Sequence, residues 1–324
     1  MNRFILVASL GLSFATPLMA QEGKLLIYTS QPQSDAQQTI DAFKAQYPKV
    51  EVNFVRDGTP RIMARLRSEI EAGKPQADVL LIADAVTMEG LKQEGRLLPH
   101  GNADVSAYPK ELHDPAKTWF ATKLITTGIV YNTKAPLKPT SWSDLVRPDM
   151  RNAVVLPSPL NSGAAMVHTV TLASNLKQGW SYYEALKKNG AVAAGANGDV
   201  LKQVASGEKL YGMIVDFMPI REKAKGSPVE FVFPEEGVSA VSEPVAILSS
   251  TANPVAAKAF IDFLISQKGQ ELASKQGYIP AMPGVALPPG YPDRSVIRLM
   301  NFDVPKAIVG EKANRLQFID IFGQ

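Results

Sequence analysis

The first quarter of the chain alternates short apolar segments with amphipathic ones. This alternation constrains the choice of fold more than any other feature of the sequence. Residues 24–28, 50–55 and 78–82 have the pattern of β-strands, while residues 34–47 have the period of a helix and Thr59-Pro60 is a typical helix start. The continuous apolar run at 78–82 is typical of a parallel strand that helices cover on both faces. We therefore expect an α/β fold with right-handed crossovers and ligand loops at the carboxyl ends of its strands.

A second α/β unit begins after Lys123 and is joined to the first without a long linker. Its predicted strands and helices cover residues 128–132, 139–145, 153–156, 163–175, 199–206, 211–215, 244–248 and 254–268. Removal of a leader leaves about 304 of the 324 residues, which is the size of two domains. We expect strands that cross between the domains instead of a flexible tether.

Residues 1–20 have the pattern of a secretory signal peptide. Arg3 supplies the positive charge, Phe4 to Phe14 form a short apolar core, and Ala20 ends a run of small residues suited to cleavage. The absence of cysteine excludes disulfides and thiolate chemistry. The near balance of 34 Lys+Arg against 31 Asp+Glu argues against nucleic-acid binding. We expect an exported, periplasmic, monomeric protein.

The start of the helix predicted at 163–175 is a candidate anion site. Ser162 precedes it as a potential N-cap, and Gly163 leaves the backbone bare. The first N–H groups of a helix have no intrahelical acceptor and carry partial positive charge, so they can hold a small anion. The alternative is an ordinary serine cap without a ligand.

Motifs of enzymes are missing from the sequence. His100, His113 and His168 lack the spacing of metal ligands, and there is neither a Gly-x-Ser-x-Gly elbow nor a phosphate-binding Gly-Lys-Ser/Thr motif. We therefore expect no catalytic residue, no cofactor and no resident metal.

The order of these segments resembles the type II periplasmic solute-binding proteins of ABC importers, within the ferric-ion and organophosphorus group. The segments that carry the resemblance include residues 26–30, 77–81, 127–132, 141–145, 157–164, 253–260 and 277–280. It implies a two-lobed fold in which each lobe is a mixed, mostly parallel sheet flanked by helices, with crossing strands as the hinge. It places residues 21–125 and 245–324 in the first lobe and 126–244 in the second.

The resemblance also indicates which half of the family's site survives. Ferric binders carry two adjacent tyrosines where this chain reads Asp216-Phe217-Met218, and Phe and Met cannot supply phenolate to Fe(III). The anion half remains, as Ser162-Gly163-Ala164 with Asn197. An anion seat plus the carboxylate of Asp216 would suit a ligand with a phosphonate at one end and an ammonium at the other, so the resemblance favours 2-aminoethylphosphonate.

The remaining predicted contacts are Ser30 and Asp84 on the first lobe and Thr127 near the hinge. Asp216 has two structural alternatives, a pair with Arg221 or a cap on the next helix, and Asp84 has the alternative of capping the helix after it. The expected partners are a small anionic or zwitterionic ligand and an ABC permease. Alternative ligands are a phosphorylated sugar, another phosphate ester, thiamine or Fe(III), and the alternative class is an exported phosphoesterase.

Overall fold

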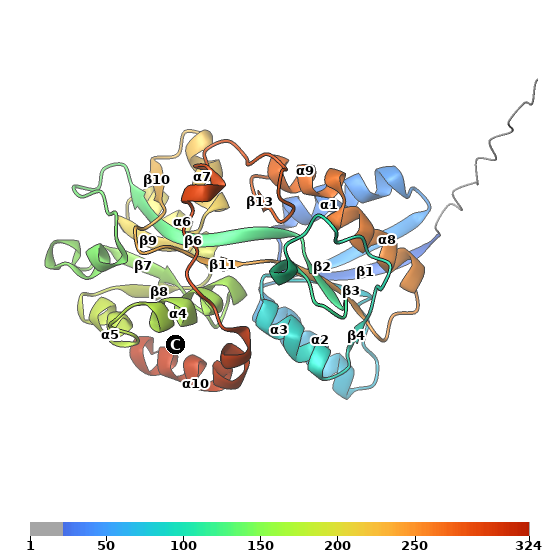
Figure 1. Cartoon of the computed structure of the whole chain (residues 1–324). Coiled ribbons are helices and arrows are strands. Elements are labelled where there is room, and N and C mark those ends of the chain that lie inside the picture. Colours follow the sequence, from blue (N-terminus) through green and yellow to red (C-terminus); the bar gives the residue numbers. More distant parts are fainter. Residues whose placement is uncertain (1–21, 324) are drawn as a thin grey trace, which may run out of the picture.

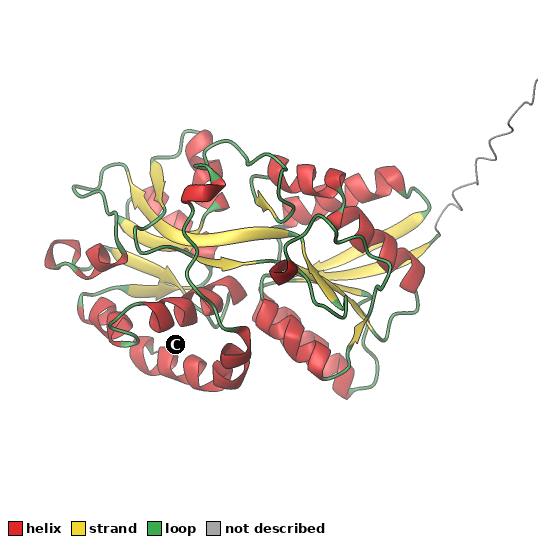
Figure 2. Cartoon of the chain, viewed as in Figure 1, coloured by secondary structure: helices red, strands yellow, loops and turns green. Residues whose placement is uncertain are grey.

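A computed structural model describes residues 22–323 and arranges them in two lobes (Figure 1). Each lobe is a sheet with helices on its faces, as Figure 2 shows. The two-lobed α/β architecture agrees with the sequence prediction. The predicted signal peptide, residues 1–20, lies outside the described residues.

The first lobe contains a six-stranded sheet in the order β2-β1-β3-β12-β4, with β5 paired to β12. Its strands are β1 (Gly23–Thr29), β2 (Val50–Arg56), β3 (Val79–Leu81), β4 (Leu97–Leu98), β5 (Trp119–Ala121) and β12 (Pro244–Leu248). Its helices are α1 (Gln33–Gln46), α2 (Thr59–Glu71), α3 (Ala85–Gln93), α8 (Pro254–Ile265) and α9 (Gln267–Lys275).

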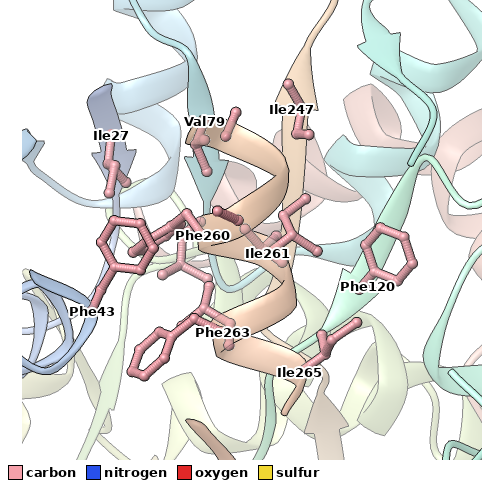
Figure 3. Close-up of a cluster of buried hydrophobic side chains, with 14 of the residues drawn as sticks. Ile27, Phe43, Val79, Phe120, Ile247, Phe260, Ile261, Phe263 and Ile265 are labelled. Carbon is pink, nitrogen blue, oxygen red and sulfur yellow. The ribbon is translucent and has the colours of Figure 1, made fainter. Parts of the chain in front are cut away.

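Alternation along β1 divides the core of this lobe between the two faces of the sheet. Leu25 and Ile27 pack in the cluster formed with α1 and α8, which Figure 3 shows around Phe43 and Phe260. Tyr28 packs on the other face, in the cluster that includes residues of α2 and α3. This is the two-sided burial that the apolar strands predict, because successive side chains of a strand point to opposite faces.

The second lobe contains a seven-stranded sheet in the order β10-β6-β9-β7-β8, with β11 and β13 paired to β6. Its strands are β6 (Lys123–Asn132), β7 (Val154–Pro157), β8 (Val192–Ala194), β9 (Tyr211–Val215), β10 (Val229–Val232), β11 (Ser239–Val241) and β13 (Ile279–Pro280). Its helices are α4 (Gly163–Asn175), α5 (Ser181–Lys188), α6 (Asn197–Ser206), α7 (Phe217–Ala224) and α10 (Val304–Phe322).

Two strands near the junction of the lobes, β6 and β12, account for the mixture of parallel and antiparallel pairing in both sheets. β1 pairs in parallel with β2 and β3, and β7 pairs in parallel with β8 and β9. Within the described residues, every antiparallel ladder between named strands includes β6 or β12. Antiparallel pairing therefore has a larger share than the sequence analysis expected, because the strands at the crossings enter their sheets against the direction of the neighbouring strands.

The C-terminal segment departs from the predicted lobe boundary, which assigned residues 245–324 to the first lobe. The N–H of Val238 donates to Arg298 O, and Phe318 and Phe322 of α10 are buried in the core cluster of the second lobe. α10 also contacts α3 of the first lobe. The chain thus returns to the second lobe at β13, and the aromatic side chains of α10 hold it there.

Candidate ligand-binding cleft

A cavity of about 340 Å³ lies between the two lobes. It is bounded by the loops that follow β1, β2 and β3 and by the segments that begin α4, α6 and α7, together with residues from the crossing region. Its lining residues are Ser30, Pro32, Arg56, Asp57, Gly58, Thr59, Arg61, Ala83, Ile125, Asn161, Ser162, Gly163, Ala164, Gly195, Ala196, Asn197, Gly198, Asp199, Val215, Phe217, Met218, Glu243 and Tyr278. Below, "the cleft" means this cavity.

The second-lobe wall of the cleft includes the start of α4. Ser162 is the N-cap, and its Oγ accepts from Ala165 N at 3.2 Å and from Asn197 Nδ2 at 3.1 Å. Because that oxygen acts as an acceptor in both bonds, the hydroxyl hydrogen remains available to a ligand. Asn197 is held in turn by Val215 N, which donates to its Oδ1 at 3.2 Å.

Two backbone donors at the same wall are also available. The N–H groups of Gly163 and Ala164 precede the first intrahelical bonds of α4, and no acceptor for them is found among the described residues. With the Ser162 hydroxyl they make three donors at the positive end of a 13-residue helix. This arrangement can hold an oxyanion by hydrogen bonds without a charged side chain.

The first-lobe wall is cationic, and sequence reasoning missed this feature. Arg56 ends β2, and its Nε donates to Gln31 O at 2.8 Å, which holds the guanidinium beside the loop after β1. Arg61 lies in the first turn of α2 and forms an exposed pair with Asp57 at 3.4 Å. The signal was available, since Arg56 lies at the carboxyl end of a predicted parallel strand, where ligand loops are expected.

Ser30 lies on this same wall. Its Oγ accepts from Ala83 N at 2.9 Å, which ties the loop after β1 to the loop after β3. Its hydroxyl hydrogen can therefore also serve a ligand in the cleft.

A buried ion pair lies at the floor of the cleft. Lys123 Nζ and Glu243 Oε2 are 2.6 Å apart, and their side chains are 3% and 2% exposed. Gln31 Nε2 donates to the same oxygen at 3.0 Å, and the ring of Tyr278 lies 3.9 Å from the Lys123 ammonium. Because the two charges offset each other, the floor adds little to the positive potential of the arginine wall.

Asp216 does not line the cleft, so its predicted contact with the ligand is not supported by the geometry. The side chain is fully buried and accepts from Thr126 N at 3.0 Å, Thr126 Oγ1 at 2.7 Å and Phe217 N at 2.7 Å. Burial raises its pKa to about 6. Three donors already satisfy its two oxygens, and the residue caps α7, which was one of its structural alternatives.

Asp84 and Thr127 also lie outside the cleft. Asp84 caps α3, accepting from Val86 N at 2.9 Å and from the Thr87 hydroxyl. It lines a neighbouring cavity of about 140 Å³ with Glu311, and burial is the main cause that raises its pKa to about 6. Thr127 is buried inside β6, between Ser239 of β11 and Val215 of β9.

The described residues contain no group of three or more His, Cys, Asp or Glu side chains placed to hold a metal ion. Phe217 and Met218 line the cleft where the resemblance would place phenolate ligands. Between residues 22 and 323 the structure also has no helix with the length and apolar character needed to cross a membrane.

Comparison with known proteins assigns the family. The model of the bacterial extracellular solute-binding proteins matches residues 74–304, and the chain belongs to that family. The periplasmic binding protein AfuA of Actinobacillus pleuropneumoniae, solved with fructose 6-phosphate bound, superposes with a TM-score of 0.84 at 23% identity, over 94% of this chain and 99% of that one.

Two other relatives have iron in their structure or in their name. Iron-bound HitA of Pseudomonas aeruginosa superposes with a TM-score of 0.79 at 20% identity, over 92% of this chain and 99% of that one. Iron uptake protein A1 of a Synechocystis strain is 23% identical over 303 residues, which cover 87% of this chain and 83% of that protein. AfuA and HitA thus share one fold, while the ligands in their structures differ.

Proposed function

We propose that this protein captures a phosphate monoester, such as a phosphorylated sugar, in the cleft and delivers it to an ABC permease. The observation that carries the proposal is the meeting of two donor sets from opposite lobes. Gly163 N–H, Ala164 N–H and the Ser162 hydroxyl lie on one wall, and Arg56 and Arg61 lie on the other. A dianionic phosphoryl group has oxygens for both sets, and charge-assisted hydrogen bonds are the stronger kind.

The rest of the cleft suits a polar organic tail. Its lining includes Ser30 and Asn161 as hydrogen-bonding groups and Phe217 and Met218 as apolar surface. Polar groups mixed with apolar surface in a cavity of about 340 Å³ suit a ligand larger than inorganic phosphate. AfuA, whose structure contains fructose 6-phosphate, provides a precedent for this ligand class on the same fold.

A second candidate ligand is 2-aminoethylphosphonate, which the sequence favours. Its phosphonate would use the same donors, but Asp216 is not placed to receive its ammonium. Three other carboxylates line the cleft. Glu243 is paired with Lys123, so those of Asp57 and Asp199 support this candidate instead. Fe(III) has less support, because neither arginine nor backbone N–H groups are ligands for a cation.

The mechanism of capture that we propose is closure of the two lobes about the crossing strands. Each lobe carries part of the donor set, so a ligand binds the closed state better than the open one, and this difference drives closure. The protein would act as a monomer in the periplasm after removal of residues 1–20.

Calorimetry with a ligand panel tests the proposal. The panel is fructose 6-phosphate, fructose, 2-aminoethylphosphonate, inorganic phosphate and Fe(III). We expect fructose 6-phosphate to bind and fructose not to bind, since the phosphoryl group supplies the charge. Binding of 2-aminoethylphosphonate alone would move the assignment to the second candidate. Tight binding of Fe(III) without any phosphoryl ligand would contradict both.

A further inference from the structure

Two glycines lie where the lobes touch beside the cleft. Gly58 precedes α2 in the first lobe, and a Cβ built on it would lie 2.4 Å from the carbonyl oxygen of Asn161 in the second lobe. Gly163 begins α4 in the second lobe, and its Cβ would lie 2.9 Å from Ala83 O and 3.0 Å from Thr59 Oγ1 in the first. These separations are shorter than the roughly 3.5–4.0 Å of an ordinary contact between non-bonded atoms.

The backbone conformation does not require a glycine at either position. Gly58 has φ −61° and ψ 147°, which any residue can adopt, and Gly163 is not among the glycines with positive φ. Of the three atoms nearest to a Cβ on Gly58, one belongs to its own lobe, in the ring of Pro60 at 3.9 Å. The atoms that exclude a side chain at both positions come from the opposite lobe, and two of them are backbone carbonyl oxygens, which have little freedom to move aside.

We propose that Gly58 and Gly163 are closure residues, whose missing side chains let the starts of α2 and α4 meet when the lobes close. When the lobes are apart, the atoms of the opposite lobe that crowd both positions are withdrawn, and an alanine is accommodated more easily. In the closed molecule it forces the walls of the cleft apart and weakens the grip on the ligand. This inference rests on the proposed capture of a ligand between the lobes, but not on which ligand is captured.

The main test is Gly58→Ala, with Gly90→Ala as the matched control. Gly90 lies in α3, where an added Cβ meets nothing within 4 Å. We expect the affinity for fructose 6-phosphate, measured by calorimetry, to fall about tenfold or more in Gly58→Ala and to hold in Gly90→Ala. The melting temperature without ligand should stay near that of the unsubstituted protein. An unchanged affinity in Gly58→Ala would overturn the inference.

A distance measurement separates hindered closure from direct obstruction of the ligand. Because the natural chain has no cysteine, spin labels can be attached at Lys74→Cys in the first lobe and Lys188→Cys in the second, both exposed. With saturating fructose 6-phosphate, we expect a longer distance between the labels in Gly58→Ala than in the unsubstituted pair. The same distance in both would mean that the methyl group blocks only the ligand, and the inference would be wrong.

A ligand-free measurement keeps this inference independent of the ligand's identity. Arg61→Cys and Asn161→Cys place thiols on the two lobes beside the Gly58 contact, where a short bismaleimide can join them during transient closure. We expect slower joining when Gly58→Ala is added. Equal rates, or no joining in either protein, would overturn the inference. Failure of fructose 6-phosphate to bind, by contrast, would contradict only the proposed ligand.

Gly163→Ala is the second variant. Alanine keeps the backbone N–H at this position, so the donors for an oxyanion remain in place. The same loss of affinity and the same longer distance are therefore expected from the added Cβ alone. Wild-type affinity in this variant would remove Gly163 from the proposal.

Discussion

The two walls of the cleft offer hydrogen-bond donors of different kinds. The second-lobe wall is built from backbone N–H groups and the Ser162 hydroxyl, which are fixed by the start of α4. The first-lobe wall is built from Arg56 and Arg61, which are exposed, and each side chain makes one hydrogen bond within the described part of the chain. The fixed wall therefore defines the position of an oxyanion, and the cationic wall supplies most of the charge that attracts it.

The largest effect should come from the cationic wall. Arg56→Ala removes a charged donor, and we expect the affinity for fructose 6-phosphate to fall about 10- to 100-fold by calorimetry, which is the range for hydrogen bonds to charged groups. Arg67→Ala is the control, because Arg67 pairs with Glu94 on the surface and does not line the cleft. Equal losses in the two variants would mean that net charge matters and the position of Arg56 does not.

Asp216→Asn should lower the stability of the protein and leave its affinity for the ligand nearly unchanged. An amide cannot accept from all three donors around Asp216, so the free energy of unfolding in urea should fall by about 2 kcal/mol. Affinity should change little, because the side chain lies outside the cleft. Asp41→Asn, on the exposed side of α1, is the control. A large loss of affinity with unchanged stability would return Asp216 to the ligand site.

Acid should lower the free energy of unfolding through His168, which lies in α4. The ring is buried, its Nδ1 is 2.9 Å from Ser239 Oγ, and burial lowers its pKa from 6.5 to about 3. Between those values the unfolded chain binds a proton that the folded protein does not, so stability falls as the pH decreases through this window. From pH 7 to pH 5 this residue should cost about 2 kcal/mol of unfolding free energy.

His168→Gln tests this contribution by urea unfolding at pH 7 and pH 5. The variant should retain about 2 kcal/mol more of its stability across that interval than the unsubstituted protein. Asp84 and Asp216, whose pKa values are raised to about 6, act in the opposite direction, and they are present in both proteins. His113→Gln changes a partly exposed histidine and serves as the control. Parallel pH dependences in all three proteins would contradict the assignment to His168.

Of the two walls, the second-lobe wall should give the smaller effect on affinity. Ser162→Ala removes one neutral donor, and we expect a loss of affinity of about fivefold together with about 1 kcal/mol of stability from the lost cap. Ser266→Ala, which removes the N-cap of α9 away from the cleft, should lower stability to a similar degree and leave affinity unchanged. A larger loss of affinity in Ser162→Ala than in Arg56→Ala would mean that the second-lobe wall contributes more to binding than the arginine wall.

Local structure was predictable from the sequence where a residue pattern allows one outcome, and it was not predictable where the pattern allows two. The bounds of α4, residues 163–175, and the cap at Ser162 were predictable because caps depend on neighbouring residues. The roles of Asp84 and Asp216 were not, because a carboxylate at the end of a strand can face a cleft or cap the next helix. Only the direction of the side chain distinguishes these two cases, and in both the donors of nearby backbone determine it.

The first-lobe wall and the C-terminal helix depend on contacts between distant segments. Arg56 faces the cleft because β2 ends beside the loop after β1. The place of α10 is determined by Phe318 and Phe322, whose partners come from the second lobe, more than 100 residues earlier in the chain in several cases. The pattern of α10 alone does not indicate which lobe it covers.

The position of α10 makes it a natural place for an optical reporter. Its C-terminal end is buried in one lobe and its body touches α3 of the other, so any opening of the molecule must change the surroundings of the α3–α10 junction (Figure 1). A dye attached there through a single introduced thiol would lie outside the cleft and change its emission as the lobes move. The protein could thus be converted into a sensor for its own ligand without alteration of the residues that bind it.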